Sequence, residues 1–277
     1  MPRRKMIKGI CRLCKKYKDL SFEHIPPSVA FNKLTKYRSV PYIEYMEQSH
    51  KPNYKPSGKL HQGGVGENCL CVTCNSFLGT NYVNDYYKVA LNAKAIVQKY
   101  SFKVVQFEVD DFSPLRFLKQ VLSMFICINK PEFTDNNPEL LDFVKDSRSN
   151  VLPEKYKVYM YVNGGGQIKK LPWVFHNKFG LVCEIAFQPL GFVLSIDTNS
   201  GFENLSAFDN LAEITKIKDL DCNLIGSASF TVFNLITNSQ NPLDFRSEEE
   251  IQETIKANLK LLSDAEFEDS SQNPPKN

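Results

Sequence analysis

The stretch ENCLCVTCN, residues 67–75, contains a Cys-x-x-Cys pair followed by an asparagine, and CRLC, residues 11–14, provides a second pair. Two pairs with this spacing can supply the four thiolates of a tetrahedral structural zinc site. The predicted ligands are Cys11, Cys14, Cys71 and Cys74. Cys69 can replace Cys71, but the two-residue spacer favours Cys71 and leaves Cys69 as a packed or free thiol. We therefore expect a zinc-stabilised unit that joins two distant segments.

The composition is that of a globular protein. The 277 residues are 42% hydrophobic and 23% charged, which suffices for one large domain or two small ones. The basic N-terminus lacks the apolar run of a signal peptide, and no stretch approaches the roughly 18 apolar residues of a membrane helix. We therefore expect a cytoplasmic protein with no membrane partner, in which clustered thiols bind metal instead of forming disulfides.

The net charge of +3 conceals an asymmetry along the chain. Residues 1–100 hold 17 Lys and Arg against 6 Asp and Glu, a net charge of +11, and the remainder holds 17 against 25, a net charge of −8. A basic surface around a metal site is typical of a protein that binds a phosphate backbone. A solvated lysine-rich surface explains the charge equally well.

The order of predicted elements indicates an α+β protein. Residues 1–100 form the zinc unit, with an insertion at about 28–66 that we expect to hold little regular structure. Residues 101–263 form a mixed α+β accessory domain, and the acidic residues 264–277 form a disordered tail. Strands are expected within 101–112, 157–162, 180–188, 191–197 and 228–236.

Three helices have clear sequence signals. Apolar residues on one face predict a helix at 84–100. Ser113 as N-cap and Pro114 at the first helical position predict a helix that ends near residue 128, and a capping box of Ser247 and Glu250 predicts a helix at 247–262. The glycines of NGGGQ, residues 163–167, match no nucleotide-binding pattern and predict a hairpin turn.

Polar residues beside the two cysteine pairs suggest a catalytic site. Glu23 and His24 follow the first pair and Asn75 follows the second, so a closed zinc unit can bring a carboxylate, an imidazole and an amide oxygen together. The two oxygen groups suit Mg²⁺ or Mn²⁺, which binds a scissile phosphate and stabilises the leaving oxygen. His24 can take the proton of an attacking water. This trio fits phosphodiester hydrolysis.

The run CRLCKKYKDLSFEHIPP and the later GENCLCVTCN resemble the HNH endonuclease superfamily in its zinc-knuckle form, which has a ββα-metal fold. The layout is similar to that of endonuclease VII-type resolvases and of bacterial HNH proteins with an EHI-P core. The resemblance covers residues 8–85. It implies a general base at His24, a metal-binding acid at Glu23, an amide ligand at Asn75 and a further ligand at Asn81 or Asp85. Glu23 stands where Asp is commoner.

Two functions are consistent with these features. The first is a metal-dependent HNH endonuclease or nickase acting on DNA, with RNA left open as a substrate, in which residues 101–263 serve homo-oligomerisation, a protein partner or regulation, as in defence or mobile-element nucleases. The second is a non-catalytic zinc-stabilised nucleic-acid-binding module or regulator. The insertion can contact nucleic acid, although a solvated loop fits as well. The residues for that contact are Lys51, Tyr54, Lys55 and Lys59. The complete trio favours the nuclease.

Overall fold

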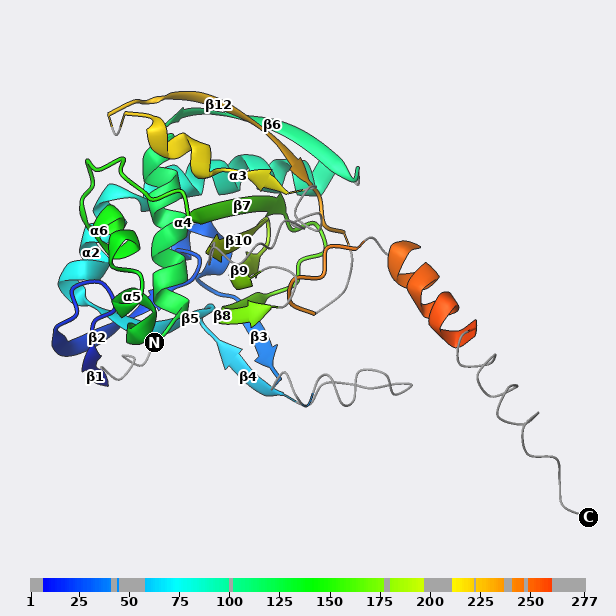
Figure 1. Ribbon diagram of the computed structural model, residues 1–277, viewed down its shortest axis with the longest axis horizontal. Coiled ribbons are helices and arrows are strands. Elements are labelled where there is room, and N and C mark those ends of the chain that lie inside the picture. The colour runs from blue at the N-terminus through cyan, green and yellow to red at the C-terminus, as the bar shows by residue number, and fades with distance from the viewer. Residues whose placement is uncertain are drawn as a thin grey trace, which may run out of the picture.

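The structure is a computed structural model with a mixed α+β fold, which confirms the predicted fold class (Figure 1). A long helix, α4 (Pro114–Ile128), runs through the centre of the molecule, and antiparallel sheets and shorter helices surround it. The structure describes residues 7–40, 44, 58–99, 102–176, 180–196, 211–221, 223–236, 241–246 and 249–260.

The N-terminal part is a three-stranded antiparallel sheet followed by two helices. The strands pair in the order β1-β2-β5. Their bounds are β1 Ile7–Ile10, β2 Tyr17–His24 and β5 Gly66–Cys71, and α2 (Val72–Asn81) and α3 (Val83–Lys99) follow β5 directly. Helix α3 confirms the helix predicted at 84–100. Helix α2 was not predicted, because it buries only Cys74 and Leu78 and has no apolar stripe.

The insertion between β2 and β5 contains regular structure. A helical turn, η1 (Ser28–Asn32), is followed by β3 (Lys36–Ser39), which pairs with β4 (Lys59–Gln62) in antiparallel fashion. Figure 1 shows these strands as an arm that projects from the body, and we call it the β3–β4 arm. The prediction of little regular structure is wrong for these residues. Strands of four residues rich in Lys, Arg and Ser carry too weak a periodic signal to be recognised.

The C-terminal part is built on a five-stranded antiparallel sheet in the order β11-β7-β10-β9-β8. The strands are β7 Tyr156–Val162, β8 Lys169–His176, β9 Gly180–Phe187, β10 Leu190–Ile196 and β11 Ala212–Glu213. A separate antiparallel pair consists of β6 (Val104–Phe112) and β12 (Gly226–Phe233). Each of the five predicted strand regions therefore contains a strand.

Several elements of this part differ from the prediction. The NGGGQ stretch joins β7 to β8, and β10 and β9 lie between these two strands, so the predicted hairpin turn is wrong. Strand β8 and three short helices were not predicted. The helices are α5 Pro131–Asp135, α6 Pro138–Lys145 and η3 Thr215–Asp219.

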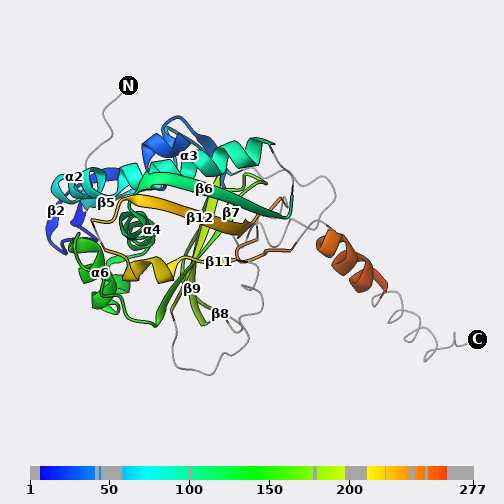
Figure 2. The same ribbon diagram turned by 90° about the horizontal axis from the view of Figure 1, so that it is seen from above.

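Helix α4 connects the two parts of the molecule. It begins at Pro114 as predicted, and each of its residues except Arg116 is buried. Figure 2 shows it end-on, with α3, β6 and α6 around it. The Ser113 hydroxyl makes no capping bond to α4; instead its backbone N–H donates to the Asp85 carboxylate at 2.7 Å. Buried residues from both parts form one hydrophobic cluster, so the core crosses the boundary predicted near residue 100, and that boundary stays a prediction.

The C-terminal end is described only in part. Residues 249–260 are helical, within the predicted helix at 247–262, and Ser247 of the proposed capping box lies outside the described residues. The predicted tail, 264–277, also lies outside them. In the parts of the chain that are described, no helix has the length and apolar character to cross a membrane.

Candidate metal centre and active site

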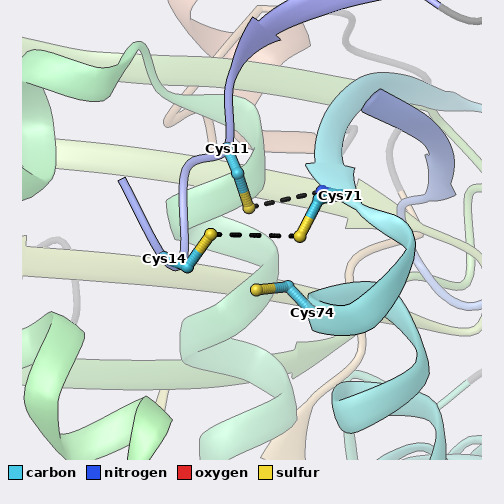
Figure 3. Close-up of side chains that lie close together, drawn as sticks. All are labelled: Cys11, Cys14, Cys71 and Cys74. Carbon is cyan, nitrogen blue, oxygen red and sulfur yellow. Dashed lines mark hydrogen bonds between the residues drawn. The ribbon is translucent and has the colours of Figure 1, made fainter. Parts of the chain in front are cut away.

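The four predicted zinc cysteines converge on one point (Figure 3). Cys11 and Cys14 come from the turn between β1 and β2, and Cys71 and Cys74 come from the junction of β5 and α2. Their four sulfur atoms all lie within 4.8 Å of one another, and those of Cys14 and Cys71 are 3.9 Å apart. Thiolates bound to zinc at about 2.3 Å in a tetrahedron lie about 3.8 Å from each other. The four sulfur atoms are therefore close enough together to bind a metal ion such as zinc.

Backbone hydrogen bonds shape both cysteine pairs. The Cys11 N–H donates to the Lys16 carbonyl at 3.0 Å, and the Lys15 N–H donates to the Cys11 carbonyl at 2.8 Å. Lys15 closes this tight turn with a positive φ of 61°. In the second pair, Cys71 precedes α2 and its N–H donates to the Cys11 sulfur at 3.3 Å. These turns point the thiols inward and place the Cys71 N–H donor against the Cys11 sulfur.

The electrostatics of the cluster favour a bound cation. A hydrogen bond from the Cys74 thiol, together with backbone N–H groups, lowers the pKa of Cys11 to about 4. The same contact with Cys11, followed by burial, raises the pKa of Cys74, and burial raises the pKa of Cys14. Without a cation the cluster thus favours a thiolate at Cys11 and disfavours thiolates at Cys14 and Cys74. A divalent cation allows all of them to ionise.

Cys69 lies outside this cluster. It is fully buried, and its contact with the thiol of Cys127 in α4 raises the pKa of Cys127. Arg12 reaches the same place, where its guanidinium donates to the Cys127 carbonyl and pairs with Glu67 at 2.8 Å. Cys69 therefore belongs to the packing between the three-stranded sheet and α4.

Glu23 is a buried acid that has no counter-charge among the described residues. It lies one residue before the end of β2 and is only 8% exposed. Burial raises the pKa of its carboxyl to about 8. Within the described part of the chain, no hydrogen bond or ion pair reaches this carboxylate. A buried carboxylate requires a proton or a cation, so Glu23 fits a metal ligand.

His24 projects from the opposite face of β2, because successive residues of a strand alternate. Its Nε2 lies 3.2 Å from the Gly63 carbonyl oxygen. A carbonyl can only accept, so Nε2 carries the hydrogen, and in the neutral ring Nδ1 then keeps the lone pair that accepts a proton. The Phe22 ring packs edge-on at 5.1 Å, and a Cβ on Gly64 would lie 2.7 Å from the imidazole. The ring therefore has a fixed tautomer in a tight slot.

Asn75 lies in α2 against the strand that carries Glu23 and His24. Its amide donates to the Ser21 hydroxyl at 3.1 Å and to the Phe22 carbonyl at 3.5 Å. The trio is thus gathered around the last four residues of β2, with Glu23 and His24 on opposite faces.

The two further ligands that the resemblance implies make other contacts. The Asn81 amide donates to the Phe77 carbonyl of its own helix at 2.8 Å, and Asp85 accepts the Ser113 N–H. Both side chains are used in contacts that hold helices in place, and neither faces the zinc cysteines or β2.

A pocket of about 980 Å³ lies beside His24. The β3–β4 arm, residues 64–66 and the start of β8 line it. Of the predicted nucleic-acid contacts, Lys59 is exposed on β4, and Lys51, Tyr54 and Lys55 lie outside the described residues. The sequence did not predict that the aromatic and basic residues of this pocket lie together, because strand pairing and packing bring them together from distant parts of the chain. They are Phe22, Tyr37, Arg38, His61, Lys169 and Lys170.

Comparison of the chain with protein-family models, with curated proteins and with solved structures found no match.

Proposed function

We propose that this protein is a metal-dependent endonuclease or nickase of the HNH type that hydrolyses phosphodiester bonds in DNA. The observation that carries the proposal is the hydrogen bond between His24 Nε2 and the Gly63 carbonyl. It holds the imidazole in the tautomer whose Nδ1 accepts a proton, which a general base requires. The partnerless carboxylate of Glu23 on the same strand adds the acid that a catalytic cation needs.

The order of elements also supports the proposal of an HNH-type nuclease. The antiparallel strands β2 and β5 are followed directly by α2, with His24 on the first strand and Asn75 on the helix. A strand-strand-helix order with these residue types is what the HNH resemblance implies. Cys11 and Cys14 precede β2, and Cys71 and Cys74 lie where β5 meets α2, so a zinc ion would tie the start of this segment to its strand–helix junction.

The chain's own residues then have distinct roles. His24 Nδ1 takes a proton from the water that attacks the phosphorus, and the Gly63 carbonyl stabilises the imidazolium through the Nε2–H bond. Glu23 and Asn75 would hold Mg²⁺ or Mn²⁺. When bound, such an ion neutralises negative charge on the phosphate and on the leaving oxygen.

The second candidate is a non-catalytic zinc-stabilised nucleic-acid-binding module. The burial of Glu23 and its position on the face opposite His24 favour this alternative, because both side chains then serve packing beside the cysteines. A role of residues 101–263 in oligomerisation, partner binding or regulation stays a prediction under either function, and so does the cytoplasmic location.

A plasmid-nicking assay with Mg²⁺ and with Mn²⁺ tests the proposal on the wild type and on His24→Ala. We expect the variant to keep its zinc and to cleave roughly 10²- to 10⁴-fold more slowly, the usual effect of losing a positioned general base. Exogenous imidazole should restore part of the rate. If the wild type cleaves no form of DNA or RNA with either ion, the binding module replaces the nuclease.

A further inference from the structure

The pocket beside His24 is formed by two segments that are far apart in the sequence. One side is the β3–β4 arm, and the other is the first part of β8, next to which the arm lies in Figure 1. Gly64, which lines the pocket, also forms the slot for the His24 imidazole. His24 itself does not line the pocket, and Phe22 and Gly64, which do, separate a ligand there from the proposed general base by one residue.

The charge of the pocket is positive. None of the described residues that line it is acidic, whereas Arg38, Lys169 and Lys170 are basic. Lys170 pairs with Glu67 at 2.5 Å, a carboxylate that it shares with Arg12. Arg38 is exposed and donates to the Gly58 carbonyl at 3.2 Å, and no acidic side chain of the described chain pairs with it. Arg38 is thus the basic residue of the arm that an anion in the pocket can pair with.

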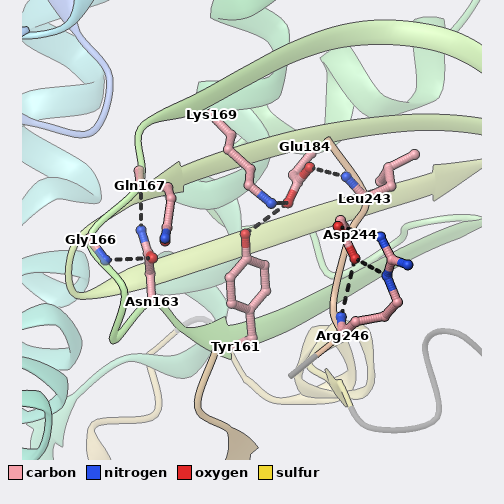
Figure 4. Close-up of polar contacts among 9 residues, drawn as sticks. All are labelled: Tyr161, Asn163, Gly166, Gln167, Lys169, Glu184, Leu243, Asp244 and Arg246. Carbon is pink, nitrogen blue, oxygen red and sulfur yellow. Dashed lines mark hydrogen bonds and ion pairs between the residues drawn. The ribbon is translucent and has the colours of Figure 1, made fainter. Parts of the chain in front are cut away.

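The wall formed by β8 is fixed by a buried polar cluster (Figure 4). The Lys169 ammonium points away from solvent and lies 3.5 Å from the Glu184 carboxylate, with both side chains almost fully buried. Tyr161 donates to the same carboxylate at 2.8 Å, and the Leu243 N–H donates at 2.6 Å. The Lys169 ammonium therefore serves the buried ion pair and does not face a ligand in the pocket. The exposed cation that can bind an anion in the pocket is Arg38.

The arm also provides a flat aromatic surface. Tyr37 of β3 and His61 of β4 face each other across the strand pair, with ring centroids 4.8 Å apart and planes at 11°. The Ser39 hydroxyl lies 2.8 Å from His61 Nε2 and orients that ring. Tyr37 and Arg38 leave opposite faces of β3, and both line the pocket. A stacked aromatic pair and a cation that line one pocket can receive a nucleobase and its phosphate.

We infer that this pocket holds an unpaired strand of nucleic acid, with a base against the Tyr37–His61 platform and a phosphate at Arg38. The inference rests on the proposed function and adds that the substrate has an unpaired segment next to the scissile phosphate. The pocket volume of about 980 Å³ is at the upper end of the roughly 300–1,000 Å³ typical of small-molecule sites. A pocket of this size accommodates a few nucleotides of a single strand.

Fluorescence anisotropy with a short labelled oligonucleotide tests the inference on the full-length protein without divalent cations, so that no cleavage occurs. We expect the single strand to bind more tightly than its duplex. Tyr37→Leu should weaken single-strand binding about 5- to 100-fold, as expected for a lost stacking contact, whereas Tyr37→Phe should bind normally. Arg38→Ala should reduce the slope of log affinity against log salt by about 0.7, the contribution of one phosphate on a single strand.

Arg148→Ala is the matched control, because Arg148 is exposed after α6 and does not line the pocket. Equal effects of Arg38→Ala and Arg148→Ala, or duplex binding as tight as single-strand binding, would overturn the inference. A mononucleotide that competes as well as the oligonucleotide would also overturn it, because the pocket would then hold a free nucleotide. Binding without any cleavage would refute only the proposed function, whereas cleavage of a fully paired duplex with unchanged rates in Tyr37→Leu would refute only the inference.

Discussion

Two buried acids in this protein have opposite surroundings. Glu184, in the five-stranded sheet, is compensated by the Lys169 ammonium, the Tyr161 hydroxyl and a backbone N–H. Glu23, in the three-stranded sheet, has no partner in the part of the chain that the structure describes, and its pKa rises to about 8. A buried carboxylate that the protein itself neutralises has a structural role. One that it leaves without a counter-charge indicates a site that an external ion completes.

The cysteines show the same contrast. Cys183 of the five-stranded sheet is a fully buried single thiol, next to the Asn129 amide. The four clustered cysteines of the N-terminal part instead place their sulfur atoms together with no cation from the protein. The clustered thiols and the uncompensated acid thus lie within residues 11–75, whereas the buried acid of the C-terminal sheet has an ion pair and hydrogen bonds. The following predictions test this division.

Loss of one zinc cysteine should have the largest effect. Cys11→Ser or Cys74→Ser removes a ligand from a site whose zinc binding contributes about 10 kcal/mol or more to folding. We expect these variants to lose zinc and to unfold or aggregate, as measured by metal analysis and circular dichroism. Cys69→Ala is the control, because Cys69 lies outside the cluster. Retention of one zinc per folded chain in Cys74→Ser would contradict the assignment.

Breaking the compensated pair should have a smaller effect. Lys169→Met leaves Glu184 buried without its cation and should lower the free energy of unfolding by about 3–5 kcal/mol. The double variant Lys169→Met/Glu184→Gln should recover a large part of that loss, because it removes both charges. Denaturant titration measures both changes, and zinc content should stay at the wild-type value. A double variant no more stable than Lys169→Met would show that the pair is not the main source of the loss.

Glu23→Gln should instead stabilise the protein when no Mg²⁺ or Mn²⁺ is added. The carboxyl of Glu23 has a pKa of about 8 in the folded chain against its usual 4.5, so the folded state binds more protons between these values. The free energy of unfolding of the wild type therefore falls as the pH rises from about 4.5 to about 8. The free energy of unfolding of Glu23→Gln lacks this pH dependence. Above pH 8 it should exceed that of the wild type by up to a few kcal/mol, since one pKa unit corresponds to about 1.4 kcal/mol.

Thermal unfolding across this pH range measures the difference between the two proteins. It should be near zero below pH 4.5 and constant above pH 8, where the wild-type carboxyl has released its proton in both states. A constant difference at every pH would mean that Glu23 is not desolvated as the structure describes.

The sequence predicted the parts of the site that depend on local spacing. The cysteine pairs and α4 follow from residues that are close in the chain, and the structure confirms that the cysteines meet. The burial of Glu23 depends on α4, which packs against β5 and brings Cys127 close to Glu23 from more than ninety residues later in the chain, and no local pattern encodes it. The stacking of Tyr37 on His61 likewise depends on the register of two short strands.

Binding of Mn²⁺ by the zinc-loaded protein tests most directly whether Glu23 completes an ion site. Calorimetric titration should be made on the wild type, on Glu23→Gln and on the double variant Lys169→Met/Glu184→Gln as the control for a buried acid. We expect one Mn²⁺ to bind to the wild type and to the double variant, and binding to be at least tenfold weaker in Glu23→Gln, which loses a charged oxygen ligand. Equal Mn²⁺ affinity in the wild type and in Glu23→Gln would contradict the account.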